Sequence, residues 1–232
     1  MPFPRFHREL RRIWSQIRKT ALRARLGQRW DEDGTLARRR YPDYETYLAH
    51  QRLKVDALRA RSIEGHDRRF HAVLSERLAA SPVELVGRSV LCLAARVGTE
   101  VRAFVDLGAF AVGIDLNPGR DNGWVVVGDF HALQYARGSV DVVYTNSLDH
   151  GFEIDRVLSE VLRVLKPGGA FLVEIGLGTA EGGGAGFYEA LSWERVDEMI
   201  ERVAGAGFEV KERTAFDVPW TGVHVVLEKP AD

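Results

Sequence analysis

The chain has 232 residues, a formal net charge of -1, and a composition of 28% charged and 45% hydrophobic residues. These values are typical of a soluble globular protein with one substantial core. They exclude a membrane span, because no apolar run approaches the roughly 20 residues that a crossing requires. The chain's one cysteine, Cys92, excludes an internal disulfide bond and a cysteine zinc cluster.

Residues 1–30 are strongly basic, with nine arginines and lysines against a single acid, Glu9. Apolar residues recur there at steps of three and four and define one face of an expected helix: Phe6, Leu10, Ile13, Ile17 and Ala21. Such a helix either packs on its own domain with solvated arginines, or binds an anionic membrane surface or RNA. We expect packing on the domain, without integral membrane contact and without a nucleic-acid partner. Charges stand where a secretory segment needs an apolar stretch, so the expected location is cytoplasmic.

Residues 31–89 are expected to be helical and connective, after a polar break at 31–34. A second amphipathic helix is indicated by Tyr44, Tyr47, Leu48, Gln51, Val55 and Leu58. A third is indicated by Phe70, Val73, Leu74 and Leu78, and Ser81-Pro82 is expected to end it. We therefore predict an N-terminal helical extension over residues 1–85, which covers a ligand site or supports a homodimer.

From Ser89 onward, short apolar runs alternate with helical patterns. The runs SVLCLA, AVGID, WVVVGD, VDVVYTN and AFLVEI are apolar throughout, which is typical of parallel strands covered on both faces. Between the last two, Ile154, Val157 and Leu158 begin a helical stripe, and Lys166 is expected in its last turn. This order predicts a doubly wound α/β sheet with its ligand site beyond the carboxyl ends of the strands.

The C-terminal part predicts how the sheet ends. The glycine-rich stretch GLGTAEGGGAG at 176–186 is expected to be a mobile loop, and Ser192 is expected to cap a helix. The runs FEVKERTAF and GVHVVLEK are too close for a helical crossover, so they should be antiparallel. Residues 86–232 are thus predicted to form one Rossmann-like α/β domain, with a mostly parallel seven-stranded sheet that ends in an antiparallel hairpin.

This order of elements resembles the class I S-adenosylmethionine-dependent methyltransferases, and the resemblance covers roughly residues 86–229. The segment RVLKPGGAFLVEI matches the stretch before the family's fifth strand closely, and the glycine loop is that of a type 11-like branch with an arginine variant. The resemblance implies S-adenosylmethionine as cofactor and methyl transfer to an oxygen or nitrogen of a small-molecule acceptor.

The resemblance also implies the cofactor site. Asp115 ends the second strand where the family binds the ribose hydroxyls, and Asp129 and Phe130 stand beside the adenine position. In the family's glycine loop, Cys92, Ala94 and Arg96 take the first three of the patterned places, and Gly98 keeps its glycine. The full expected set of cofactor-binding residues is Ala94, Arg96, Gly98, Glu100, Asp115, Leu116, Asp129, Phe130 and Asn146.

The two departures from the glycine pattern lead to specific expectations. Ala94 is tolerable if its φ is negative. The Arg96 guanidinium is expected to bind the methionine carboxylate, and Glu100 its ammonium. If Arg96 instead blocks the pocket, the domain is a related fold without cofactor.

The fourth strand runs into TNSLDHGFE, which brings Asp149 and His150 to the carboxyl edge as candidate catalytic residues. An unperturbed imidazole has a pKa of about 6.5, which suits a general base that deprotonates a hydroxyl or amine during methyl transfer. In the other interpretation, Asp149 or Ser147 caps the next helix and His150 faces solvent. We expect no metal, because the adjacent residues Asp149 and His150 rarely ligate one ion on a regular element.

Two other functional classes compete with this one. A nucleotide-binding oxidoreductase is disfavoured, because the loop lacks the GxGxxG pattern and an antiparallel sheet end is unusual for that fold. A catalytically silent binding module, associating with membranes or RNA through its basic helix, is left open by the sequence.

Overall fold

The structure is a computed structural model that describes residues 14, 17, 30–34, 36–52 and 60–231. The predicted basic helix of residues 1–30 lies outside the described residues, apart from Trp14, Ile17 and Trp30. None of the described helices combines the length and hydropathy that a membrane span needs.

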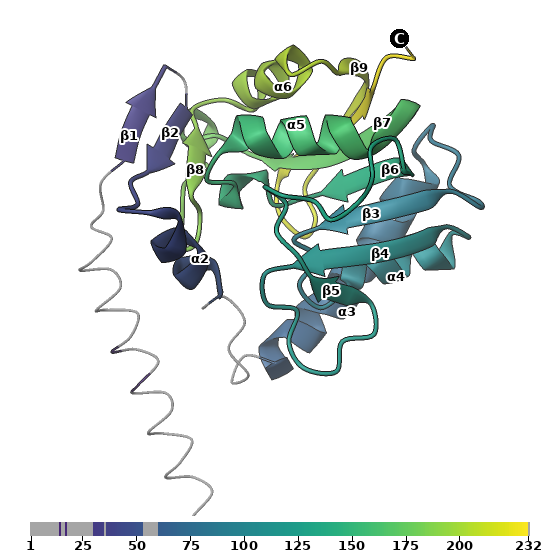
Figure 1. The fold of residues 1–232 in the computed structure, drawn as a ribbon, viewed down its shortest axis with the longest axis horizontal. Coiled ribbons are helices and arrows are strands. Elements are labelled where there is room, and N and C mark those ends of the chain that lie inside the picture. The colour runs from purple at the N-terminus through teal and green to yellow at the C-terminus, as the bar shows by residue number, and fades with distance from the viewer. Residues whose placement is uncertain (1–13, 15–16, 18–29, 35, 53–59, 232) are drawn as a thin grey trace, which may run out of the picture.

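A seven-stranded sheet in the order β5-β4-β3-β6-β7-β10-β9 forms the centre of the fold (Figure 1). The first five strands in that order pair in parallel, and β10 pairs antiparallel with both β7 and β9. This confirms the predicted sheet and its antiparallel end. The strands are β3 (Ser89–Leu93), β4 (Phe110–Asp115), β5 (Val125–Val127), β6 (Val140–Thr145), β7 (Leu165–Gly176), β9 (Glu209–Phe216) and β10 (Gly222–Glu228).

Helices cover both faces of this sheet. On one face, α3 (Ala60–Ala79) and α4 (Thr99–Asp106) pack against residues such as Cys92 and Leu172. On the other, α5 (Ile154–Val164) and α6 (Val196–Gly205) pack against residues such as Leu93. Because side chains alternate between the two faces, a strand covered on both sides is apolar throughout.

Two predicted helix boundaries are wrong. Helix α5 ends at Val164, so Lys166 lies in β7, where its ammonium contacts the Asp141 carboxylate at 2.8 Å. Ser192 caps no helix, because it lies in β8 (Leu191–Trp193), and α6 begins only at Val196.

The N-terminal extension is only partly helical, which corrects the prediction. Strands β1 (Trp30–Asp33) and β2 (Leu36–Arg39) form a hairpin, and β2 pairs antiparallel with β8. The polar break contains its turn, in which Gly34 has a φ of 65°. Helices α2 (Tyr44–Arg52) and α3 agree with the predicted second and third helices, except that Val55 and Leu58 lie outside the described residues.

The glycine-rich stretch, which was expected to lack regular elements, contains one after β7, and its mobility stays a prediction. It contains a 3₁₀ turn, η3 (Thr179–Glu181), whose Glu181 carboxylate accepts from the backbone N–H groups of Gly178 and Val196 at 3.0 and 2.9 Å. A side chain at 178 would put its Cβ 2.2 Å from the Glu194 carbonyl oxygen. Glycine is required there by this close backbone approach.

Candidate functional site

The loop between β3 and α4 has three left-handed residues at alternate positions. The φ angles are 54° at Ala94, 45° at Arg96 and 83° at Gly98. The expectation that Ala94 has a negative φ is therefore wrong. The backbone keeps the shape that glycines normally provide, although two of the three residues carry a Cβ, and each such residue costs about 1–2 kcal/mol.

Hydrogen bonds to the backbone hold this loop in place. The N–H of Arg96 donates to Asp115 Oδ2 at 3.0 Å, and the Arg96 carbonyl accepts from Asn122 at 3.1 Å. Asp115 Oδ1 accepts from the N–H of Asn117 at 2.8 Å. The carboxylate of Asp115 thus joins the loop after β3 to the loop after β4.

Gly98 is required in this loop for steric reasons. It precedes α4, and a Cβ at this position would lie 2.6 Å from the Trp124 Cβ. It lines neither of the two cavities that the described residues enclose at this edge of the sheet. A direct contact between Gly98 and the cofactor therefore stays a prediction.

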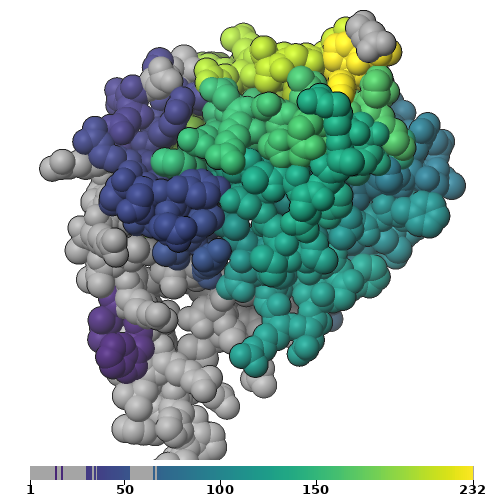
Figure 2. Space-filling view, in the orientation of Figure 1, coloured from purple at the N-terminus to yellow at the C-terminus, as the bar shows by residue number. Residues whose placement is uncertain are grey.

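The smaller cavity lies at the carboxyl ends of β3 and β4. Its volume is about 40 Å³, which holds only about three waters. Four of the predicted residues line it together with Arg96, namely Ala94, Asp115, Leu116 and Phe130. Tyr47 and Gln51 from α2 close it, and Figure 2 shows α2 in dark blue packed against the teal part of the domain.

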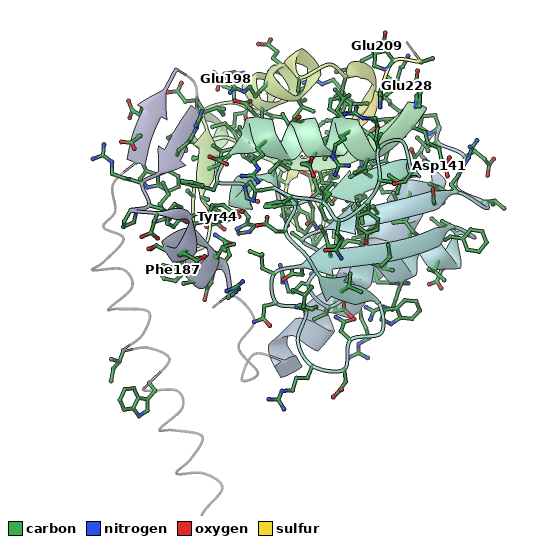
Figure 3. All side chains as sticks on the ribbon, in the orientation of Figure 1. Tyr44, Asp141, Phe187, Glu198, Glu209 and Glu228 are labelled. Carbon is green, nitrogen blue, oxygen red and sulfur yellow. The ribbon has the colours of Figure 1, made fainter. Side chains whose placement is uncertain are left out.

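Asp129 lies outside both cavities. Its Oδ2 accepts a short hydrogen bond from the Tyr44 hydroxyl and is thereby linked to α2, and Oδ1 contacts His131 Nδ1 at 2.8 Å. Burial acts to raise the pKa of Asp129, but the bonds from His131 and Tyr44 outweigh burial and lower it. In Figure 3, Tyr44 lies at the side of the domain where α2 packs. Any contact from Asp129 to adenine would share the carboxylate with Tyr44.

The larger cavity has a volume of about 390 Å³ and runs from the start of α4 to the β7–β8 connection. Arg96, Glu100 and Asn146 line its first part, and Asn146 Nδ2 lies 3.4 Å from Glu100 Oε1. Burial raises the pKa of Glu100 to about 7, against the opposing charge of Arg96. Glu100 is thus a buried acid whose ionised form gains from a bound cation.

Asp149 and His150 line the second part of the larger cavity, on the 3₁₀ turn η2 (Leu148–His150). His150 is 7% exposed, so the interpretation that it faces solvent is wrong. Its Nδ1 lies 3.0 Å from the Tyr188 carbonyl, and its Nε2 lies 3.8 Å from Asp149 Oδ1. Within the described residues, neither Ser147 nor Asp149 caps α5, whose cap residue is Glu153.

Sequence reasoning missed several side chains at these cavities. Glu174 on β7 and Glu189 after the glycine-rich turn both line the larger cavity, with Trp193 and Trp220. Possible ligand atoms of Asp149, His150 and Glu189 lie within 4.8 Å of one another, which weakens the argument that adjacency excludes a metal. The sequence offered one signal for these residues, the glycine-rich stretch, because binding and catalytic residues often lie on loops.

Comparison with known proteins points to methyltransferases. Residues 91–173 match the family model described as a methyltransferase domain. An uncharacterised methyltransferase of Synechocystis is 34% identical over 118 residues, which are 46% of this chain and 54% of that protein. The demethylmenaquinone methyltransferase of Renibacterium salmoninarum is 32% identical over 118 residues, 47% of this chain and 48% of that one. The chain thus spans about half the length of these curated relatives.

Solved structures share the fold. A structure from Haloferax volcanii, described as a complex between the Trm112 methyltransferase activator and a putative methyltransferase, aligns with a TM-score of 0.62 at 23% identity. The alignment covers 78% of this chain and 97% of that one. Burkholderia thailandensis 1,6-didemethyltoxoflavin-N1-methyltransferase, with S-adenosylhomocysteine bound, aligns with a TM-score of 0.60 at 17% identity, covering 87% and 99%.

Residues 91–173 therefore match a methyltransferase domain, and the fold is that of the class I S-adenosylmethionine-dependent methyltransferases, whose cofactor is S-adenosylmethionine. Two features of the structure fit this cofactor. Each Asp115 oxygen accepts one backbone N–H and keeps a lone pair for a hydroxyl, and Glu100 is a buried acid beside Arg96. At about 40 Å³ the smaller cavity is too small to hold a nucleoside without a rearrangement of its lining.

The left-handed backbone at Ala94 generates a stability prediction. Ala94→Gly should raise the free energy of unfolding by up to about 1 kcal/mol, because relief of the left-handed conformation exceeds the added entropy of the unfolded chain. The neighbouring Ala95→Gly is the control, since Ala95 is buried and has no positive φ. It should lower the free energy of unfolding. Urea denaturation compares the two, and equal losses in both variants would contradict the strain at Ala94.

Proposed function

We propose that this chain is an S-adenosylmethionine-dependent methyltransferase that methylates an oxygen or nitrogen of a small-molecule acceptor. The observation that carries the proposal is that Asp115 at the end of β4, Glu100 in α4 after β3 and His150 in η2 after β6 meet around two adjoining cavities. Arg96 and His150 line both cavities and so lie where a cofactor site and an acceptor site would join. The carboxyl edge of a doubly wound sheet is also where such folds bind ligands.

The ribose, the methionine carboxylate and the methionine ammonium each have a matching side chain in this arrangement. The remaining lone pairs of the Asp115 carboxylate accept from the ribose hydroxyls. The Arg96 guanidinium binds the methionine carboxylate and Glu100 binds its ammonium, both as charge-assisted hydrogen bonds. These roles agree with the two ends of the site, since Asp115 lines the smaller cavity and Glu100 the larger.

When bound, S-adenosylmethionine supplies a methyl group activated by a sulfonium. The residues of the chain align the acceptor and, where it carries a proton, remove it. His150 is positioned for that role, because its Nδ1 faces the carbonyl of Tyr188 and must therefore carry the hydrogen. In the neutral ring, Nε2 is then the basic nitrogen, near Asp149.

The N-terminal extension, residues 1–85, acts as a cover for the domain of residues 86–232. Its described part contacts the site directly, since the Tyr47 hydroxyl donates to the His150 carbonyl at 2.9 Å and Gln51 donates to the Tyr188 carbonyl at 2.8 Å. Movement of α2 would open the smaller cavity to the nucleoside. The homodimer stays a prediction.

Loss of the Asp115 charge should weaken cofactor binding. In Asp115→Asn, the charge-assisted bonds to the ribose are lost, each worth about 1.5–3 kcal/mol before relaxation, so affinity for S-adenosylmethionine should fall at least tenfold. Because the carboxylate also holds the loop, the free energy of unfolding should fall by about 1 kcal/mol. Calorimetric titration and urea denaturation measure the two effects. The exposed Asp121→Asn is the matched control, and unchanged affinity in Asp115→Asn would remove the ribose assignment.

Cofactor affinity should depend on pH through Glu100. Its pKa is about 7 in the ligand-free site, and a bound ammonium favours the ionised carboxylate and lowers that pKa, so binding releases a proton. Affinity should be highest above pH 7 and fall by up to about tenfold per unit below it. Titration in buffers of different ionisation enthalpy detects the released proton. Glu100→Gln should abolish this dependence while His150→Gln keeps it, and the reverse result would place the ammonium elsewhere.

The role of His150 is tested by separating binding from turnover. His150→Gln keeps a polar side chain but accepts no proton, so S-adenosylmethionine should bind normally while kcat falls about 10²- to 10⁴-fold. The rise of the wild-type rate with pH should also disappear in the variant. Both are measured with an acceptor found by screening. If rate and pH profile are retained, alignment alone supplies the catalysis.

A further inference from the structure

A third cavity, here called the outer cavity, lies apart from the candidate site. It has a volume of about 530 Å³ and is lined by the C-terminal part of α3, by β9 and by β10. Among the described residues, none lines both the outer cavity and the larger cavity of the candidate site. The proposed methyl transfer makes no use of this space.

His224 on β10 lines the outer cavity and is only 2% exposed. It pairs with Thr214 of β9 and with Glu174 of β7 in the sheet. Its side chain lies on the same face as Val226, which packs in one apolar cluster with Leu74 of α3. Neither ring nitrogen of His224 has a hydrogen-bond partner in the part of the chain that the structure describes. Buried ring nitrogens are normally bonded, so this ring is suited to bind a ligand in the cavity that it borders.

Glu174 determines which nitrogen of His224 receives a ligand. The Glu174 Oε1 atom is paired with the Arg77 guanidinium and lies 3.8 Å from His224 Nδ1, too far for a hydrogen bond. A carboxylate at this distance still favours the hydrogen on Nδ1, because its negative charge attracts the positive end of an N–H group. In the neutral ring, Nε2 then carries the lone pair. The ligand group at Nε2 is therefore a hydrogen-bond donor.

The acids of the outer cavity favour a donor that is positively charged. Three carboxylates line the cavity, those of Glu76, Glu212 and Asp217. Glu76 and Asp217 are exposed and form its rim, whereas Glu212 is half-buried and accepts from the Thr214 hydroxyl at 3.2 Å. Carboxylates gathered around one cavity attract a cation and repel an anion.

Arg77 is the one cation among the described residues that line the outer cavity. Its guanidinium is already engaged on three sides. It pairs with Glu174, donates to the Val218 carbonyl at 2.8 Å and lies over the Phe216 ring at 3.8 Å. Because Glu174 compensates the charge of Arg77, the three other carboxylates leave the cavity negative.

From these observations we propose that the outer cavity binds a small aliphatic diamine in its diammonium form. One ammonium donates to His224 Nε2, and the other pairs with Glu76 and Asp217 at the rim. The alkyl chain between them packs on apolar side chains of the lining, such as Val73 and Ala80. This inference does not depend on the proposed methyltransferase function.

The test titrates three probes of similar length into the ¹⁵N-labelled full chain at about pH 8, where an unperturbed imidazole is neutral. The probes are 1,4-diaminobutane, 1-aminobutane and 1,4-butanediol. Long-range proton–nitrogen spectra report the ring nitrogens of His224, whose signals are assigned by their loss in His224→Gln. The diamine should move the Nε2 signal and bind at least about tenfold more tightly than 1-aminobutane, because its second ammonium also reaches the rim. The diol should leave the signal in place.

Variants at the rim test the second ammonium. Glu76→Gln and, independently, Asp217→Asn should each weaken binding of the diamine about three- to tenfold. Because both residues are exposed, these variants keep the test decisive even if His224→Gln does not fold. His71→Gln is the matched control on the same helix as Glu76, since His71 pairs with Asp106 and lies outside the cavity lining. It should leave the affinity unchanged.

Three results would overturn the diamine site. The first is a His224 signal that none of the probes moves. The second is a diamine that binds no more tightly than the diol. The third is binding that is weakened in both rim variants while the His224 signal stays in place, because the diamine would then lie on the surface carboxylates alone.

Discussion

The carboxylate of Asp115 is the constraint on which this edge of the sheet depends. By accepting the N–H groups of Arg96 and Asn117, it fixes the loops after β3 and β4 relative to each other. The left-handed backbone at Ala94 and Arg96 persists because these bonds over-determine it. The same loop leads into α4, so it also sets where Glu100 meets the larger cavity. A residue chosen from the sequence as a ligand for ribose is thus also the structural support of the site.

A second set of backbone contacts organises the acceptor side. The segment Tyr188–Ala190 is bonded by His150, by the backbone of Asp149, and by Gln51 and Arg39 of the N-terminal extension. Because β2 pairs with β8, the extension is part of the same small sheet that borders the larger cavity. The extension and the glycine-rich turn therefore act together to place Glu189 and His150. This explains why a segment outside residues 91–173 bears on the site.

What the sequence predicted well was local. The apolar run of β3 and the apolar stripe of α5 each indicate burial from their own residues alone. The position of Asp115 at the end of a strand is likewise indicated by the apolar run before it. What it missed depends on distant pairing. The β1–β2 hairpin is stabilised by β8, some 150 residues away, as in the pairing of Leu36 with Trp193. Glu174 and Glu189 can be recognised as site residues only once the fold places them in one cavity. The positive φ of Ala94 is imposed by the hydrogen bonds around it, against the residue's own preference.

The buried acids indicate why the cavity has this composition. Burial raises the pKa of Glu100 from its ordinary value of 4.5 to about 7, so this group costs stability as the pH rises through that range, and the cost is complete above about pH 7. Apolar side chains of similar volume would pack at lower cost in the same places. A cation bound beside these carboxylates offsets the free-energy cost of burying them. The free energy regained appears as affinity for that cation. The burial of Glu100 in this cavity thus makes its lining more favourable for a cation than an apolar side chain of similar volume would be.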